Sequence, residues 1–291
     1  MSEHEPPVIH ARPLLTGLVI GESPRWHEDR LWFANWGAEE IVAVDLEGTA
    51  EVVAQGASGL GWSIDWLPDG RLLVTGGGLS RIEADGSKVP HADLSGLGDR
   101  FNEIVVHANG NVYVNGGNTF SPKGKPPGFI ALVTPDGVAR QVADGIAFPN
   151  GMVVTPDNST LIVAESFARR LTAFDIEDDG SLSNRRVWAD NVGPDGICID
   201  ADGAIWTVVG ELDGRLVGRV REGGEVLDRV QVEMPCFACM LGGDDRKTLF
   251  MLTADWRATD SPENNITRLT QGPRTGQLLT APAPVPGAGA P

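Results

Sequence analysis

Six segments of this chain repeat one nine-residue pattern, in which an opening residue leads into an apolar run that ends at a turn. Successive segments begin about 40 to 48 residues apart. A period near 40 residues, with several short strands per unit, is typical of a β-propeller blade. The sequence therefore predicts an all-β fold, a six-bladed β-propeller. The opening residues of the six segments are Glu22, Trp62, Asn102, Asn150, Asp195 and Ala238.

The propeller is expected to be a single domain over residues 14–281, with flexible termini at 1–13 and 282–291. The 37 glycines and 20 prolines fall at turns between short apolar runs and are not gathered in a linker. The segment PLLTGLVI is predicted to add a strand to the last blade, closing the ring and removing an exposed edge. The insertion NTFSPKGKPP is predicted to form a loop over one mouth of the channel, and the polar stretch 255–273 a loop without an amphipathic helix.

The net charge of −17 argues against nucleic acid and anionic membrane surfaces as partners, because both attract clusters of Lys and Arg. The N-terminal stretch MSEHEPPVIH has neither a basic start nor an apolar core, and no long apolar run occurs, so no signal peptide or transmembrane helix is expected. The odd count of three cysteines indicates a reduced, cytoplasmic protein. Cys236 and Cys239 form a CxxC in a strand region, where packing is favoured over redox or metal use.

Four of the six opening residues carry a side-chain oxygen: Glu22, Asn102, Asn150 and Asp195. Equivalent positions of the blades lie at equivalent heights around the axis, so these side chains are expected to converge at one mouth of the channel. Two carboxylates and two amides suit a hard divalent cation such as Ca²⁺, Mg²⁺ or Mn²⁺, and are tolerable for Zn²⁺. Each Asn-Gly or Asp-Gly pair alone could be a turn former. Their common phase with Glu22 and Asn102 favours a metal site.

Several motifs together resemble the SMP-30/gluconolactonase/luciferin-regenerating-enzyme family over almost the whole chain. The motifs are GESPRW at 21–26, RFNE at 100–103, FPNGMVVTPDNSTLIVAES at 148–166, GPDGICIDADGAIW at 193–206 and GGDDRKTLFMLTA at 242–254. The resemblance implies a six-bladed propeller with one catalytic divalent cation, and hydrolysis of lactones. Ca²⁺ is the first expectation for the cation, ahead of Mn²⁺, Mg²⁺ and Zn²⁺.

By matched position, the resemblance implies that Glu22, Asn150 and Asp195 bind the metal. Asn102 would be a fourth ligand or a substrate contact. Asp195 would also act as the general base, taking a proton from the attacking water. Arg100 would donate hydrogen bonds to the substrate. A surface salt bridge with a neighbouring acidic residue, Asp99 or Glu103, is the alternative for Arg100.

The chain departs from the family pattern near the expected substrate pocket. Ser23 replaces a glycine, Glu103 replaces an aspartate, Ala34-Asn35 replaces a Val-Asp pair, and Gly116-Gly117-Asn118 replaces a Gly-Thr-Met segment. The substrate contacts expected beside the metal are Arg100, Asn102, Glu103, Trp62 and Asn118.

Aromatic residues at or near the opening positions are candidate walls of the pocket, with core packing as an equal alternative for each. They are Trp26, Trp62, Phe148 and Phe237. An aromatic mouth would favour a lactone or ester less polar than gluconolactone.

The leading functional hypothesis is a metal-dependent lactonase, a carboxylic ester hydrolase that acts on a small-molecule lactone or ester. Lactone hydrolysis needs a polarised carbonyl, an activated water and a stabilised oxyanion, and a metal ion with an adjacent carboxylate can meet these needs. The alternatives are a phosphotriesterase of the diisopropylfluorophosphatase type and a non-enzymatic calcium-binding propeller.

Overall fold

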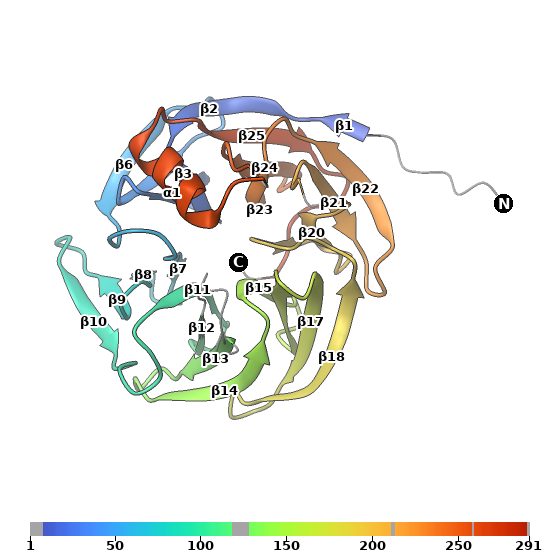
Figure 1. Ribbon diagram of the computed structural model, residues 1–291. Coiled ribbons are helices and arrows are strands. Elements are labelled where there is room, and N and C mark those ends of the chain that lie inside the picture. Colours follow the sequence, from blue (N-terminus) through green and yellow to red (C-terminus); the bar gives the residue numbers. More distant parts are fainter. Residues whose placement is uncertain (1–7, 118–127, 211–212, 258, 290–291) are drawn as a thin grey trace.

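Six four-stranded antiparallel units stand around a central axis in the computed structural model, so the predicted six-bladed β-propeller is confirmed (Figure 1). The structure describes residues 8–117, 128–210, 213–257 and 259–289. The predicted loop NTFSPKGKPP, which includes Asn118, lies outside the described residues.

In five blades the strands follow one another in sequence order from the axis outward, and in the sixth the outermost strand is the N-terminal β2. The first blade consists of β3 (Ile20–His27), β4 (Arg30–Trp36), β5 (Glu40–Val44) and β6 (Ala50–Gln55). The second consists of β7 (Ile64–Trp66), β8 (Leu72–Val74), β9 (Leu79–Ile82) and β10 (Lys88–Ala92). The third consists of β11 (Phe101–Val106), β12 (Val112–Gly116), β13 (Gly128–Val133) and β14 (Ala139–Ile146). The fourth blade consists of β15 (Pro149–Val154), β16 (Thr160–Glu165), β17 (Arg170–Ile176) and β18 (Leu182–Asp190). The fifth consists of β19 (Cys198–Ile199), β20 (Ile205–Val208), β21 (Leu216–Val220) and β22 (Val226–Gln231). The sixth consists of β23 (Cys236–Gly242), β24 (Thr248–Thr253), β25 (Gly276–Pro282) and β2 (Arg12–Leu18).

Burial along the strands explains why short apolar runs become inner strands. All residues of β15 and nearly all of β16 are buried, whereas most residues of the outer strand β18 are exposed or half-buried. Inner strands are covered on both faces by neighbouring blades, so their sequences are continuously apolar. The core therefore lies between blades: Tyr113 of one blade and Met152 of the next belong to one buried cluster.

The ring closes by pairing the two ends of the propeller within one blade. Strand β2 runs antiparallel to β25, as the segment PLLTGLVI predicted. The preceding strand β1 (Val8–His10) pairs in parallel with β22 and adds a fifth strand to the fifth blade. The described part of the N-terminal segment, where a flexible terminus was expected, is built into two sheets, and its backbone completes both edges.

The described C-terminal segment, where a flexible tail from residue 282 was expected, forms hydrogen bonds with the blades. Backbone hydrogen bonds run from Ala201 N to Pro286 O (2.9 Å), from Gly287 N to Arg246 O (2.9 Å) and from Ala288 N to Ile199 O (3.1 Å). This 284–289 segment leads from the sixth blade toward the middle of the ring (Figure 1).

One helix stands out in the sixth blade, in the stretch predicted to be a loop. Helix α1 (Pro262–Gln271) begins at Ser261, whose hydroxyl accepts a hydrogen bond from Asn264 N, and it buries Asn265 and Leu269. A Ser cap followed by Pro and an acidic residue is a standard helix start, so the sequence did carry a signal for it. Within the described residues, no helix has the length and apolarity needed to cross a membrane.

Candidate metal centre and active site

Four inner-strand entries bring side-chain oxygens to one end of the channel. Glu22 lies on β3, Asn102 on β11, Asn150 on β15, and Asp195 precedes β19. The pairing register of β3, β11 and β15 shifts just where each ligand candidate lies. A β-bulge redirects a side chain out of the regular alternation, and here it allows the side chains to point along the axis. The structure thus brings the four predicted residues together around one cavity.

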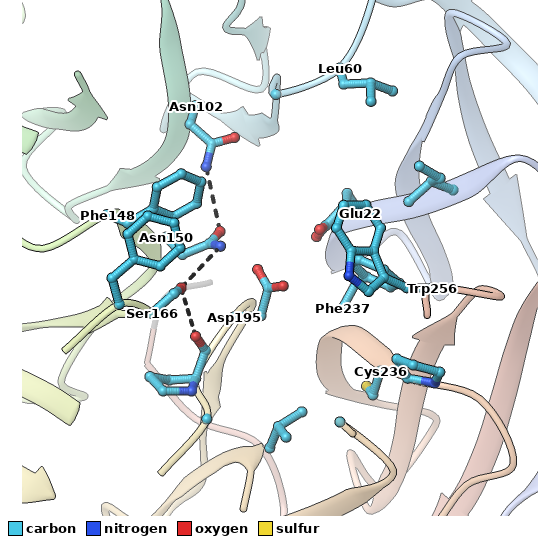
Figure 2. A pocket seen from close by; sticks show the side chains of 18 of the residues that line it. Glu22, Leu60, Asn102, Phe148, Asn150, Ser166, Asp195, Cys236, Phe237 and Trp256 are labelled. Atoms are coloured by element: carbon cyan, nitrogen blue, oxygen red, sulfur yellow. Dashed lines mark hydrogen bonds between the residues drawn. The ribbon is translucent and has the colours of Figure 1, made fainter. Parts of the chain in front are cut away.

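Hydrogen bonds link part of this oxygen ring, defined as the side chains of Glu22, Asn102, Asn150 and Asp195 (Figure 2). Asn102 Nδ2 donates to Asn150 Oδ1 (3.4 Å), and Asn150 Nδ2 donates to Ser166 Oγ (3.4 Å). Ser166 Oγ in turn donates to the carbonyl of Pro194 at 2.8 Å. The hydrogen bonds at Asn150 orient its amide, so its oxygen faces Asn102 on the ring.

Two oxygens of the ring are buried without a hydrogen-bond partner: Asn102 Oδ1 and Asp195 Oδ1. Burying an acceptor without a partner costs about 1–3 kcal/mol. Paired carboxylate and amide oxygens of this kind are the donors that hard divalent cations prefer. The residues present therefore fit a cation of the calcium or magnesium type. Among the described residues, no group of three or more His, Cys, Asp and Glu side chains gathers as a metal site, so a cation here would depend on the two asparagines.

The glycines after two ring residues are needed for close packing rather than for turns. A Cβ on Gly151 would lie 2.6 Å from Ile197 N, and one on Gly196 would lie 2.4 Å from the Cβ of Ala238. Backbone hydrogen bonds cross the same gaps, from Gly151 N to Asp195 O (3.1 Å) and from Gly196 N to Phe237 O (2.7 Å). Both glycines therefore allow the close approach of adjacent blades, Gly151 within β15 and Gly196 in the bend before β19.

Carboxyl groups at the ring repel one another. Burial, together with the charges of Asp195 and Glu103, raises the pKa of Glu22 well above its usual value. Burial raises the pKa of Asp195 to about 8, with the Glu103 carboxylate adding to the shift and a hydrogen bond from Asn150 opposing it. A bound cation would favour the ionised forms of both groups and reverse these shifts.

Glu103 lies beneath the ring and belongs to a buried ion network with Arg25 and Asp65. Arg25 Nη2 lies 3.7 Å from a Glu103 oxygen and donates to Ile104 O at 2.7 Å, while its Nε lies 3.7 Å from Asp65. Burial raises the pKa of Glu103 to about 7, although the Arg25 charge opposes the shift. Glu103 does not line the cavity, so it is placed as a partner of Arg25 and not as a substrate contact.

The cavity above the ring has a volume of about 770 Å³, which suits a small organic molecule. Arg100 lines it, as predicted, and forms no ion pair with Asp99 or Glu103 within the described residues. Trp62 does not line it. The side chain of Trp62 is fully buried against Gly56, where a Cβ would come within 2.1 Å of the indole ring.

The aromatic wall was predicted only in part. Phe148 and Phe237 line the cavity, whereas Trp26 stacks on Phe250 at 5.6 Å, away from it. Sequence reasoning missed Phe167, Trp256 and Ile266, which also line the cavity. Trp256 and Ile266 lie in the sixth-blade insertion, outside the repeated pattern, and the Ser-Pro-Glu start of α1 was the signal that could have found it.

Comparison with known proteins identifies the family. Residues 20–255 match the model described as the SMP-30/Gluconolactonase/LRE-like region. A 6-deoxy-6-sulfogluconolactonase of Pseudomonas putida is 25% identical over 94% of this chain and 94% of its own length. Regucalcin of Xenopus laevis is 25% identical over 86% of this chain and 90% of its own length.

Solved structures agree on the fold. A luciferin-regenerating enzyme superposes with a TM-score of 0.77 at 19% identity, over 97% of this chain and 98% of its own. A calcium-binding protein, regucalcin, from Agrobacterium tumefaciens superposes with a TM-score of 0.76 at 22% identity, over 98% of both chains. Together with the match over most of its length, these likenesses show that the chain belongs to the SMP-30/gluconolactonase/LRE-like family.

Proposed function

We propose that this protein is a divalent-metal-dependent lactonase, a carboxylic ester hydrolase that opens a small-molecule lactone. The observation that carries the proposal is the oxygen ring at the floor of the cavity, with Asn102 Oδ1 and Asp195 Oδ1 buried and unpaired. The names of relatives support the reaction class: besides the sulfogluconolactonase, a lactonase of Staphylococcus saprophyticus is 28% identical over 48% of this chain and 48% of its own length.

Glu22, Asn150 and Asp195 would hold the cation, with Asn102 as a fourth ligand or a substrate contact. When bound, the cation supplies Lewis-acid polarisation of the ester carbonyl and stabilises negative charge on its oxygen. Ca²⁺ is the first expectation, because the donors are oxygens and two of them are neutral amides.

Asp195 acts as the general base and accepts a proton from the attacking water at a carboxylate oxygen. Asp195 lines the cavity as a half-buried residue with its Oδ1 unpaired, while Glu22 is almost fully buried. Arg100 lies on the cavity wall with its guanidinium free of ion pairs to described residues, so it can donate to an oxygen of the substrate. The ring thus binds and orients the ester, and Asp195 moves the proton.

The test is hydrolysis of a lactone panel by the purified protein, first after chelation and then with Ca²⁺, Mn²⁺, Mg²⁺ or Zn²⁺ restored. We expect the metal to restore turnover, and Asp195→Asn to lower kcat by roughly 10²–10⁴-fold, the usual worth of a general base. Asp202→Asn, the same change at a surface carboxylate that pairs with Arg219, is the matched control.

The same panel separates the alternatives when a phosphotriester is included. Turnover of the phosphotriester without any lactone would replace the lactonase assignment with a phosphotriesterase. Metal binding by calorimetry without turnover of either class would make the ring a cation-binding site alone. Full activity in the Asp195→Asn variant would remove Asp195 from its role as base.

A further inference from the structure

Two aromatic pairs face the cavity from opposite sides of the oxygen ring (Figure 2). Phe148 stacks on Phe167 with ring centroids 4.3 Å apart, beside Asn150. Across the cavity, Phe237 meets Trp256 edge to face at 5.9 Å, beside Glu22. Asp195 lies between the two sides in Figure 2. A substrate whose ester group lies at the ring is therefore flanked by apolar surfaces.

The backbone commits Phe148 to this wall. Its φ angle is +62°, in the left-handed region that a bulky residue rarely enters. Backbone hydrogen bonds hold the residue there, from Phe148 N to Ile146 O (3.0 Å) and from Ser166 N to Phe148 O (3.2 Å). Such strain persists only where the surrounding structure enforces it, and it is concentrated at ligand sites.

The sixth-blade insertion completes the opposite wall. Helix α1 directs Ile266 to the cavity, while Leu269 seats the helix on a buried cluster that includes Val19 and Ile20. Fully buried Asn265 donates to Arg257 O at 2.9 Å and accepts from Arg257 N at 2.8 Å. The wall is thus built and held before any substrate arrives, which limits the entropy lost on binding.

Polar groups are few on this part of the cavity. Beyond the oxygen ring, the polar or charged side chains among the described lining residues are Arg100, Ser166, Arg169 and Asp213. Ser166 is already engaged by Pro194 and Asn150. Arg169 Nη2 donates to Gly210 O at 3.1 Å, whereas its Nη1 is buried without a partner among the described residues. A polyhydroxylated lactone would bury hydroxyl groups against aromatic rings, where unpaired polar groups lose their water without replacement.

We infer that the substrate of this site is a lactone carrying an apolar aromatic or branched alkyl substituent, held between the Phe148–Phe167 pair and the Phe237–Trp256–Ile266 wall. This inference rests on the proposed lactonase function and names its substrate class. The substituent lies in the apolar part of the cavity while the ester group lies at the oxygen ring. The same walls disfavour a sugar lactone, because its hydroxyl groups would lie against aromatic rings.

The experiment compares three lactones with the Ca²⁺-loaded and the Mn²⁺-loaded protein: δ-valerolactone, its phenyl-substituted derivative, and D-glucono-δ-lactone. We expect kcat/KM for the phenyl derivative to exceed that for δ-valerolactone at least about tenfold, with the gluconolactone lowest. Trp256→Ala and Ile266→Ser should each reduce the phenyl-to-valerolactone ratio. Trp66→Ala, which removes an indole stacked on His27 outside the cavity, should leave the ratio unchanged.

A binding arm keeps this inference separate from the lactonase proposal. Affinities of δ-valerolactam and its phenyl derivative, in which a ring N–H replaces the ester oxygen and resists hydrolysis, are measured by calorimetry. Tighter binding of the phenyl lactam by about tenfold or more supports the inference, whether or not any lactone is hydrolysed. A lack of lactone hydrolysis would overturn only the lactonase proposal. Equal lactam affinities, or a preference for gluconolactone in turnover, would overturn the inference while leaving a lactonase in place.

Discussion

Two carboxyl groups at the floor of the cavity, those of Glu22 and Asp195, and the nearby buried Glu103 all have pKa values raised by burial and by neighbouring carboxylates. Arg25 offsets part of this charge from below. Glu22 and Asp195 must be ionised to bind a cation, so metal binding releases protons. Glu103, which stands where the family pattern has an aspartate, is the residue whose carboxylate lies beside Arg25.

The stabilisation gained from Ca²⁺ is expected to grow as the pH rises from about 5 to about 8. In the metal-free protein these carboxyl groups have raised pKa values, so their contribution to stability is complete below the unfolded pKa of about 4 and is lost as pH rises toward about 8. Ca²⁺ binds the ionised folded form, which offsets that loss. Melting temperatures with chelator and with saturating Ca²⁺ measure the difference, and a difference that stays constant or shrinks with pH would contradict it.

At this scale the sequence predicted the ring better than the pocket. Glu22, Asn102, Asn150 and Asp195 share one phase of the repeat, and the bulged inner strands preserve that phase in space. Trp62 has the same phase, but its indole packs in the core against Gly56 and does not line the cavity, because the glycine leaves room for it. Side-chain direction depends on such neighbours, which the repeat does not encode.

At the scale of elements, blade four is held together by one buried carboxylate. Glu165, at the end of β16, accepts hydrogen bonds from Ala147 N (2.8 Å), Thr172 Oγ1 (2.5 Å) and Arg170 Nε (3.0 Å). Arg185 Nη2 on β18 adds a fourth at 3.1 Å. The group therefore joins three strands of the blade to the segment that enters it.

Glu165→Gln is expected to lower the free energy of unfolding by about 3 kcal/mol at neutral pH, because it breaks a buried ion network. Burial acts to raise the pKa of Glu165, but the hydrogen bonds and the Arg170 charge outweigh it, so the pKa is lowered. The contribution is therefore present above the unfolded pKa and lost as pH falls through the folded pKa. Denaturant titrations at neutral and acid pH measure this.

The control is Glu51→Gln, which removes an exposed partner of Arg30 and should change stability little. An equal loss in both variants, or a loss at Glu165 that does not diminish in acid, would argue against the network.

Helix α1 shows which elements a repeat cannot predict. Its apolar residues are only Ile266 and Leu269, too few for a clear helical period, and the rest of the helix is polar. Tertiary contacts of Asn265 and Leu269 stabilise it in place of a broad apolar face. The strands of the six blades were predictable because each blade repeats an order of buried inner strands followed by a more exposed outer strand.

At the scale of the whole molecule, the two ends of the channel are built differently. The oxygen ring lies where the inner strands begin, whereas the 284–289 segment contacts places where they end: a Cβ on Gly289 would lie 2.6 Å from Val154 O at the end of β15. Gly287 also forms a β-bridge with Asp200, just after β19. Substrate access and C-terminal packing are thus separated along the axis.

Truncation after Ala283 is expected to cost about 3 kcal/mol of stability, because it removes three backbone hydrogen bonds worth about 1 kcal/mol each. Metal affinity should change little, since the ring is at the other end. Truncation after Ala288 keeps all three bonds and is the control. Thermal unfolding and calorimetric Ca²⁺ titration of both variants test this, and a large loss of Ca²⁺ affinity after Ala283 would contradict the separation of the two ends.

The pairing of β2 with β25 has a consequence for how the protein is made. Strand β2 leaves the ribosome long before its partner, and until residue 282 has been translated it has no β25 beside it. Blades one to five can form during translation, but the circle stays open and β2 exposes an unpaired edge throughout. Ring closure therefore waits for the synthesis of β25, and a nascent chain halted before β25 would be a target for chaperones or for pairing with another copy.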